Sequence, residues 1–155
     1  MSQLPTSTDR LPAVGIAASL NSEERNALCY FGEFVDHAKN AALVEQGLPQ
    51  AFMHLVLEGE LRVSVKSEEA IVPLGYVERG ECVGELSLLE PVDASATVQA
   101  NAPTRTWCIS REQFDKFLEE QPVAGVKLLK AIAILLGNRL RKGSQRLLNA
   151  EADNE

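Results

Sequence analysis

The segment from residue 33 to residue 109 constrains the fold more than any other, because short apolar runs alternate there with turn residues. The turns are rich in glycine, proline, asparagine and charged residues, and lie at residues 40, 47–49, 58–59, 67–69, 79–81 and 101–103. Short runs separated by turns at this density are typical of an all-β sandwich, barrel or roll. Residues 61–66 alternate strictly between apolar and polar side chains, which predicts a strand with one buried face.

A helix is predicted just before this β-rich segment. Asn21 is a good N-cap, and Glu24 follows it by three residues, which is the spacing of a capping box. We expect Leu20, Leu28 and Phe31 to be the inward-facing anchors of this helix.

Two further helices are predicted after the β-rich segment. Ser110 can cap a short helix that continues through Leu118. Pro122 suits the first turn of a second helix, where its missing N–H costs nothing, and this helix is expected to reach about Asn149. The predicted fold is therefore mostly β with flanking helices: a double-stranded β-helix (jelly roll or β-roll) with an N-terminal helix and a long C-terminal helix.

The chain length predicts one folded unit. With 155 residues it lies within the range of a single domain. Residues 1–12 are expected to form a flexible arm, residues 13–150 the domain with its C-terminal helix, and residues 151–155 a frayed acidic tail.

Composition excludes several classes of protein. The net charge of −7 argues against a surface built to cover nucleic acid. The three cysteines, Cys29, Cys82 and Cys108, are widely spaced and form no CxxC motif, which favours buried thiols in a reducing cytoplasm. No signal peptide is recognisable, and the longest apolar run, residues 131–137, is too short for a membrane span.

No catalytic or metal-binding motif is found. His37 and His54 are the only histidines, and they form neither an HxH nor an HExxH pattern, so we expect no metal site and no enzyme activity. Trp107 is interpreted as a core residue, with base stacking as the alternative.

The stretch from residue 84 to residue 98 has the sequence of a ligand-binding turn. A glycine, a carboxylate and a short apolar turn are followed by small residues that lead into a strand. This stretch resembles the phosphate-binding cassette of cyclic-nucleotide-binding domains of the catabolite-activator (Crp/Fnr-like) type. Four further features extend the resemblance over most of the chain: the glycines Gly47, Gly59 and Gly80, and the pattern of residues 55–61.

The resemblance implies a site for a cyclic nucleotide, cAMP or cGMP, with no other cofactor required. Gly84 would let the backbone approach the ligand, and Glu85 would accept a hydrogen bond from the ribose 2′-hydroxyl. The residues that the resemblance places around the ligand are Val63, Leu74, Gly84, Glu85, Leu86, Ser87, Ser95 and Ala96. Capping of the turn at residues 86–88 is the alternative role for Glu85.

Two departures from the family pattern alter this expectation. Ala94 stands where the family usually has a phosphate-binding arginine, and losing a hydrogen bond to a charged group costs about 1.5–3 kcal/mol. Leu135 stands where an arginine would contact the cassette glutamate, and Arg139, one helical turn further on, is the hypothetical substitute. Three functions stay open: a regulatory sensor with weakened cAMP or cGMP binding, a degenerate domain that acts in protein–protein interaction, and a sensor of another small ligand.

The long C-terminal helix is predicted to form a homodimer. Its apolar residues recur at heptad spacing, and the stripe is wide enough for two partners, the β-roll and a second copy of the helix. The predicted dimer residues are Val126, Leu129, Ala133, Leu136 and Leu140. The basic residues on this helix are interpreted as a solvated face. No helix-turn-helix is recognised, so direct DNA binding is not expected, and the protein partner that receives a signal is unknown.

Overall fold

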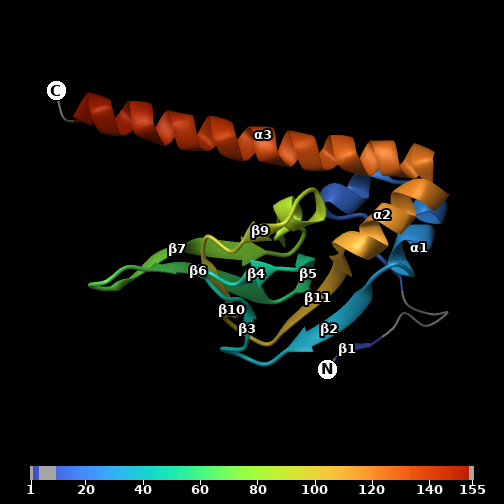
Figure 1. Cartoon of the computed structure of the whole chain (residues 1–155), viewed down its shortest axis with the longest axis horizontal. Coiled ribbons are helices and arrows are strands. Elements are labelled where there is room, and N and C mark those ends of the chain that lie inside the picture. Colours follow the sequence, from blue (N-terminus) through green and yellow to red (C-terminus); the bar gives the residue numbers. More distant parts are fainter. Residues whose placement is uncertain (1, 4–9, 154–155) are drawn as a thin grey trace.

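The computed structural model describes residues 2–3 and 10–153 and shows a β-roll with helices packed on one side (Figure 1). The helical elements are η1 (Gly15–Ser19), α1 (Ser22–Cys29), η2 (Glu85–Leu88), α2 (Arg111–Glu120) and α3 (Pro122–Asp153). The strands are β1 (Ser2–Gln3), β2 (Glu33–His37), β3 (Ala42–Val44), β4 (Pro49–Gln50), β5 (Phe52–Glu58), β6 (Glu60–Lys66), β7 (Ile71–Glu78), β8 (Cys82–Val83), β9 (Val92–Asp93), β10 (Thr97–Ala100) and β11 (Thr104–Ser110). This order confirms the predicted fold class.

The strands form two main sheets. One sheet has the order β1-β2-β11-β5-β8, and the other has the order β3-β10-β6-β7. A two-stranded ladder of β4 and β9 adds to the roll. All of the strand pairs among the described residues are antiparallel. Along each strand, successive side chains point to opposite faces of the sheet.

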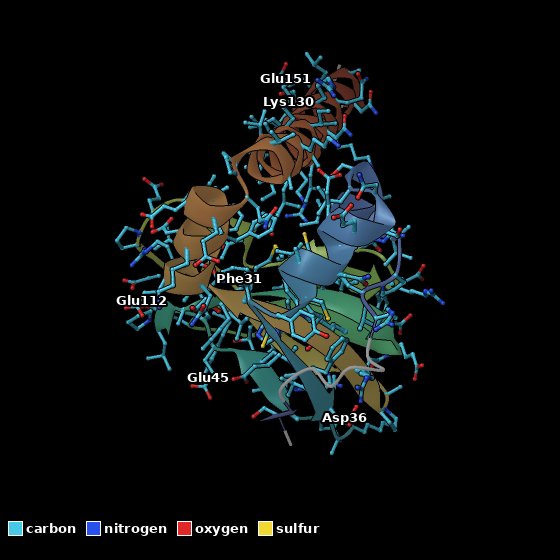
Figure 2. The ribbon with its side chains drawn as sticks, turned by 90° about the vertical axis from the view of Figure 1, so that its right-hand side faces the viewer. Phe31, Asp36, Glu45, Glu112, Lys130 and Glu151 are labelled. Atoms are coloured by element: carbon cyan, nitrogen blue, oxygen red, sulfur yellow. The ribbon has the colours of Figure 1, made fainter. Side chains whose placement is uncertain are left out.

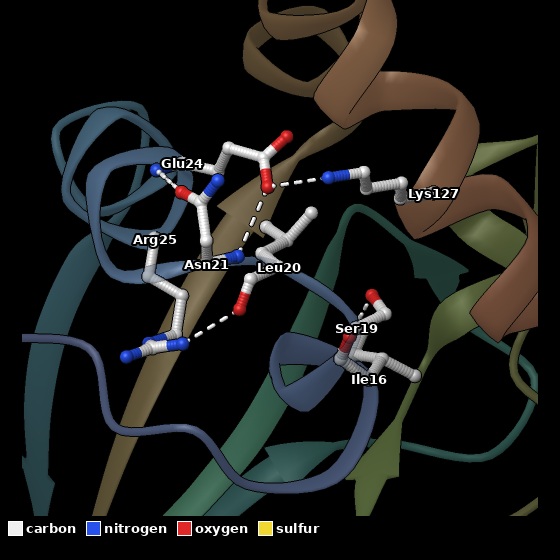
Figure 3. A network of polar contacts seen from close by, with 7 residues as sticks. All are labelled: Ile16, Ser19, Leu20, Asn21, Glu24, Arg25 and Lys127. Carbon is white, nitrogen blue, oxygen red and sulfur yellow. Dashed lines mark hydrogen bonds and ion pairs between the residues drawn. The ribbon is translucent and has the colours of Figure 1, made fainter.

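The predicted capping box of α1 is present and is joined to α3 (Figure 3). The Asn21 side chain accepts a hydrogen bond from the backbone N–H of Glu24 at 2.8 Å, and the Glu24 side chain accepts from the backbone N–H of Asn21 at 2.9 Å. The same carboxylate oxygen lies 2.8 Å from the ammonium nitrogen of Lys127 on α3. Lys127 and the Asn21 backbone lower the pKa of Glu24, which keeps the carboxylate charged at the start of α1.

Both C-terminal helices begin as predicted. Ser110 caps α2 by accepting a hydrogen bond from the backbone N–H of Gln113, and Pro122 opens α3. However, α3 continues to Asp153, four residues beyond Asn149 and through part of the predicted frayed tail. Residues 154–155 lie outside the described residues.

The predicted N-terminal arm differs from the structure where it can be compared. Residues 1 and 4–9 lie outside the described residues, but Ser2 and Gln3 form β1 and pair with β2. Leu11 is buried and packs in the larger apolar cluster, which lies between the five-stranded sheet and the helices. Backbone pairing and one apolar anchor therefore hold parts of a segment whose composition suggests a loose arm.

Two apolar clusters hold the elements together. The larger one lies between the five-stranded sheet and the helices and contains Trp107, whose indole N–H donates to the backbone carbonyl of Cys29 at 3.2 Å. Phe31 packs between α1, α2 and the sheet, with its ring centroid 5.5 Å from that of Phe117 (Figure 2). These contacts support the interpretation of Trp107 as a core residue. The smaller cluster lies inside the roll and includes Val56, Leu61 and other small side chains.

A β-bulge interrupts the pairing of β6 with β7. Val63 pairs with Gly75 and Ser64 with Pro73, so Leu74 has no partner across the ladder. A bulge bends its strand and re-aims the extra side chain. The Leu74 side chain is 58% exposed, although it was predicted to face the roll interior.

Among the described residues, none of the helices combines the length and apolar character that crossing a bilayer would require.

Candidate functional site

A cavity of about 290 Å³ lies inside the roll, between the cassette turn and α3. Side chains from both sheets, from η2 and from α3 surround it. The lining residues are Val44, Gln50, Val63, Val77, Val83, Gly84, Glu85, Leu86, Ala94, Ser95, Ala96, Val98 and Arg139. A mostly apolar cavity with a few polar groups is the usual form of a small-molecule site.

Gly84 shapes the rim of the cavity. Its φ of 81° is in the left-handed region, which favours glycine. A Cβ at this position would lie 2.4 Å from the carbonyl oxygen of Phe52 and 2.9 Å from the side-chain nitrogen of Gln50. Only glycine therefore lets the chain turn from β8 into η2 while it stays against β5.

Glu85 brings a buried carboxylate to the cavity wall. The residue is only 5% exposed, and one of its oxygens, Oε1, forms an ion pair with the Arg139 guanidinium. The other nitrogen of that guanidinium donates to the backbone carbonyl of Cys82 at 2.8 Å. Arg139 thus joins α3 to both β8 and η2. It contacts the cassette glutamate, which is the role that the sequence hypothesis gives it in place of Leu135.

The second carboxylate oxygen of Glu85, Oε2, is buried and has no hydrogen-bond partner among the described residues. Buried polar atoms are almost always paired, since an unpaired one loses its hydration without replacement. A buried acceptor at the wall of a cavity is a natural contact for a ligand hydroxyl. Capping of the turn, the alternative role for Glu85, is not seen, because Oε1 contacts Arg139 and Oε2 accepts no hydrogen bond from a described residue.

Most of the predicted site residues meet at this cavity. The seven that line it are Val63, Gly84, Glu85, Leu86, Ser95, Ala96 and Arg139. Ser87 does not line it, because its hydroxyl donates to the Gly84 carbonyl at 2.6 Å and its side chain is buried beneath the turn. Leu74 is also outside, on the exposed side of the bulge in β7.

The sequence did not single out several of the lining residues as site residues. Val44, Val77, Val83 and Val98 come from four different strands and meet only when the roll closes. Gln50 comes from β4, a strand of two residues that is fixed by its pairing with β9. Alternation along a strand could have marked the valines as inward-facing, but no local pattern marks Gln50.

Glu85 and Arg139 are the only charged side chains among the residues that line the cavity. Because they form an ion pair, the lining has no net charge. Ala94, which stands where the resemblance would place an arginine, is 6% exposed and packs with Val44 and Val98 in the cluster inside the roll.

A second polar cluster lies in the five-stranded sheet, and its residues do not line this cavity. The Thr106 hydroxyl oxygen is 3.0 Å from Nε2 of His37 and 3.3 Å from Nδ1 of His54. Burial, and then the neighbouring His37, lower the pKa of His54 from 6.5 to about 4. Burial also lowers the pKa of His37. No group of three or more His, Cys, Asp or Glu side chains within the described part of the chain could hold a metal ion.

A family model, a sequence relative and solved structures all relate this chain to cyclic nucleotide-binding proteins. Residues 34–121 match the family model "Cyclic nucleotide-binding domain". A cGMP-dependent protein kinase of Toxoplasma gondii is 26% identical over 113 residues, which are 72% of this chain and 11% of the kinase. The chain therefore spans only a small part of that relative.

Solved structures of similar fold come from several bacteria. A cyclic nucleotide-binding domain from Methylobacillus flagellatus is 28% identical, with a TM-score of 0.77 over 83% of this chain and 73% of that chain. The catabolite activator protein of Thermus thermophilus has a TM-score of 0.75 over 86% of this chain and 61% of that chain. At 24% identity, the second likeness shows the fold alone.

The Glu85–Arg139 pair gives a prediction about stability. Arg139→Met leaves a buried carboxylate without a counter-charge, and we expect the free energy of unfolding in urea to fall by about 1–3 kcal/mol. Adding Glu85→Gln to this variant removes the uncompensated charge and is expected to restore most of the loss. Additive effects of the two substitutions in this double-mutant cycle would mean that the pair does not couple α3 to the cassette.

The His37–His54 cluster gives a prediction about pH. Because the pKa of His54 is lower in the folded than in the unfolded chain, only the unfolded chain gains this proton as the pH falls from 6.5 towards 4. Stability should therefore fall over this interval, with a contribution of ~3 kcal/mol from His54. His54→Gln removes the titrating group and should flatten the pH dependence of the unfolding free energy. An unchanged slope in this variant would show that His54 does not titrate in this way.

Proposed function

This chain belongs to the cyclic nucleotide-binding domain family, and we propose that it is a non-enzymatic regulatory module that senses a small ligand. The cavity beside η2 is the proposed ligand site. The observation that carries the proposal is the buried Glu85 oxygen that lies at this cavity without a hydrogen-bond partner. A ligand hydroxyl would supply the missing donor.

The contacts of Arg139 support a route by which the ligand affects the rest of the molecule. A hydroxyl that binds Oε2 of Glu85 lies on the same carboxylate that holds Arg139, and Arg139 belongs to α3. The proposed signal is therefore a change in how α3 is held against the cassette. It would pass to a protein partner or to a second copy of the chain.

Weak binding of cAMP or cGMP is part of this proposal. The family usually places an arginine where this chain has Ala94, and the missing contact is worth roughly one to two decades of affinity. The alternative is that the same cavity binds a different small ligand and the chain acts as a sensor of that ligand.

Protein–protein interaction without a small ligand is the second candidate function. It is favoured by the apolar side chains that β7 exposes at the edge of its sheet. These side chains are Ile71, Val72, Leu74 and Tyr76. Exposed apolar groups on an edge strand are typical of a contact surface.

Thermal unfolding with a panel of cAMP, cGMP, adenosine and guanosine tests the ligand site. A ligand that binds the folded chain raises its stability by RT ln(1 + [L]/Kd), so we expect the melting temperature to rise with concentration for at least one compound. Ala96→Leu, which fills the cavity, should abolish the rise. Leu74→Ala, outside the cavity, should leave it unchanged.

A flat response to the whole panel at millimolar concentration would contradict the cavity as a site for cyclic nucleotides and nucleosides. So would an Ala96→Leu variant that responds like the unmodified chain, because the ligand would then bind elsewhere.

We also propose that α3 forms a homodimer. Of the five predicted dimer residues, Val126, Ala133 and Leu140 are exposed on one face of the helix. Leu129 and Leu136 are partly buried and pack against the chain's own core. The proposed seam is therefore centred on the three exposed residues, with the other two at its edge.

Light scattering after size-exclusion chromatography tests the dimer. We expect a mass twice the 16.9 kDa of one chain, and a shift to the monomer mass for Leu140→Glu. Lys142→Glu, about 200° further around the helix, is the control and should remain dimeric. A monomer mass for the unmodified chain across micromolar concentrations would contradict this interface.

A further inference from the structure

The charges around the cavity restrict what it can hold. The carboxylate of Glu85 and the guanidinium of Arg139 are the only charged side chains in the lining, and they neutralise each other. An anionic ligand would therefore enter a mostly apolar cavity without an available counter-charge, which is unfavourable.

Ala94 supplies no donor to an anion. Its side chain is a methyl group, and its backbone N–H donates to the carbonyl of Leu48 at 2.8 Å. Its carbonyl in turn accepts from the backbone N–H of Gly47 at 2.8 Å. The backbone N–H and carbonyl of Ala94 are thus both used in joining the end of β9 to the turn at Gly47 and Leu48.

Arg139 cannot act as the cation for a bound phosphate without giving up its ion pair with Glu85. Its guanidinium is bound to Glu85 and to the Cys82 carbonyl. If Arg139 turned towards a phosphate, Glu85 would be left as a buried carboxylate without its counter-charge, which is strongly destabilising. Arg139 therefore serves the cassette glutamate or an anion, but not both.

The remaining features favour an uncharged ligand that carries hydroxyl groups. Oε2 of Glu85 needs a donor, and Ser95 and Gln50 offer further polar contacts. The rest of the wall is apolar and suits the face of a flat ring.

We propose that this cavity takes a nucleoside in preference to a cyclic nucleotide. A nucleoside combines a flat, largely apolar base with ribose hydroxyls and has no phosphate. The proposal rests on the proposed function of the cavity as a ligand site, and it names the class of ligand. Glu85 accepts from a ribose hydroxyl, and the absence of a cation at residue 94 selects against the phosphate.

Isothermal titration calorimetry of the full chain tests this preference. Adenosine is compared with cAMP, and guanosine with cGMP, so that each pair shares a base and differs in the phosphate. We expect at least one nucleoside to bind about tenfold or more tightly than its cyclic nucleotide, because only the nucleotide buries an unpaired charge.

Each result for the unmodified chain decides a different point. A cyclic nucleotide that binds as tightly as its nucleoside, or more tightly, overturns the nucleoside proposal but leaves the cavity as a ligand site. If none of the four compounds binds, the nucleoside proposal and the proposed binding of cAMP or cGMP both fail. Neither result depends on a variant that must fold.

Ala94→Arg provides the reverse test. Its guanidinium should raise the affinity for cAMP roughly 10- to 100-fold and leave the affinity for adenosine close to that of the unmodified chain. Circular dichroism shows whether the variant is folded. An equal gain for adenosine and cAMP in a folded variant would mean that residue 94 does not act on the phosphate, and would overturn the proposed basis of selectivity.

Discussion

A buried carboxylate that needs a cation is the interaction on which the arrangement of this protein depends. Glu85 lies inside the cassette turn, and leaving it without a counter-charge would cost more free energy than most single contacts contribute. Arg139 meets this need from α3, and its second contact with Cys82 fixes the helix over the mouth of the roll. The apolar face of α3 packs on the core cluster, and the Glu85–Arg139 pair sets the charge of the cavity lining and adds a polar link between α3 and the cassette.

The pair leaves one oxygen of Glu85 free, and this asymmetry connects the fold to the proposed function. An ion pair that used both carboxylate oxygens would close the site, whereas the present geometry leaves an acceptor for a ligand hydroxyl. The residues that maintain the family fold are therefore different from the residues that select the ligand. The roll depends on its apolar clusters, to which Ala94 contributes, and the choice of ligand depends on a few polar groups.

The parts of the structure that the sequence predicted are those that depend on local signals. The capping box at Asn21 and Glu24, the cap at Ser110 and the alternation in residues 61–66 act within a few residues, and the corresponding elements formed. Glu85 and the glycine before it were found because the cassette is one continuous segment. The parts that were missed depend on contacts between distant segments. Leu74 turned outwards because of a bulge against β6, and Gln50 reached the cavity because β4 pairs with β9.

The central claim is that the free oxygen of Glu85 accepts a hydrogen bond from the 2′- or 3′-hydroxyl of the ligand's ribose. The most direct measurement is the calorimetric affinity of the unmodified chain for adenosine, 2′-deoxyadenosine and 3′-deoxyadenosine, which differ by single hydroxyl groups. A hydrogen bond to a charged carboxylate predicts that removing one of these hydroxyls weakens binding roughly 10- to 100-fold. Equal affinities for all three compounds would contradict the account.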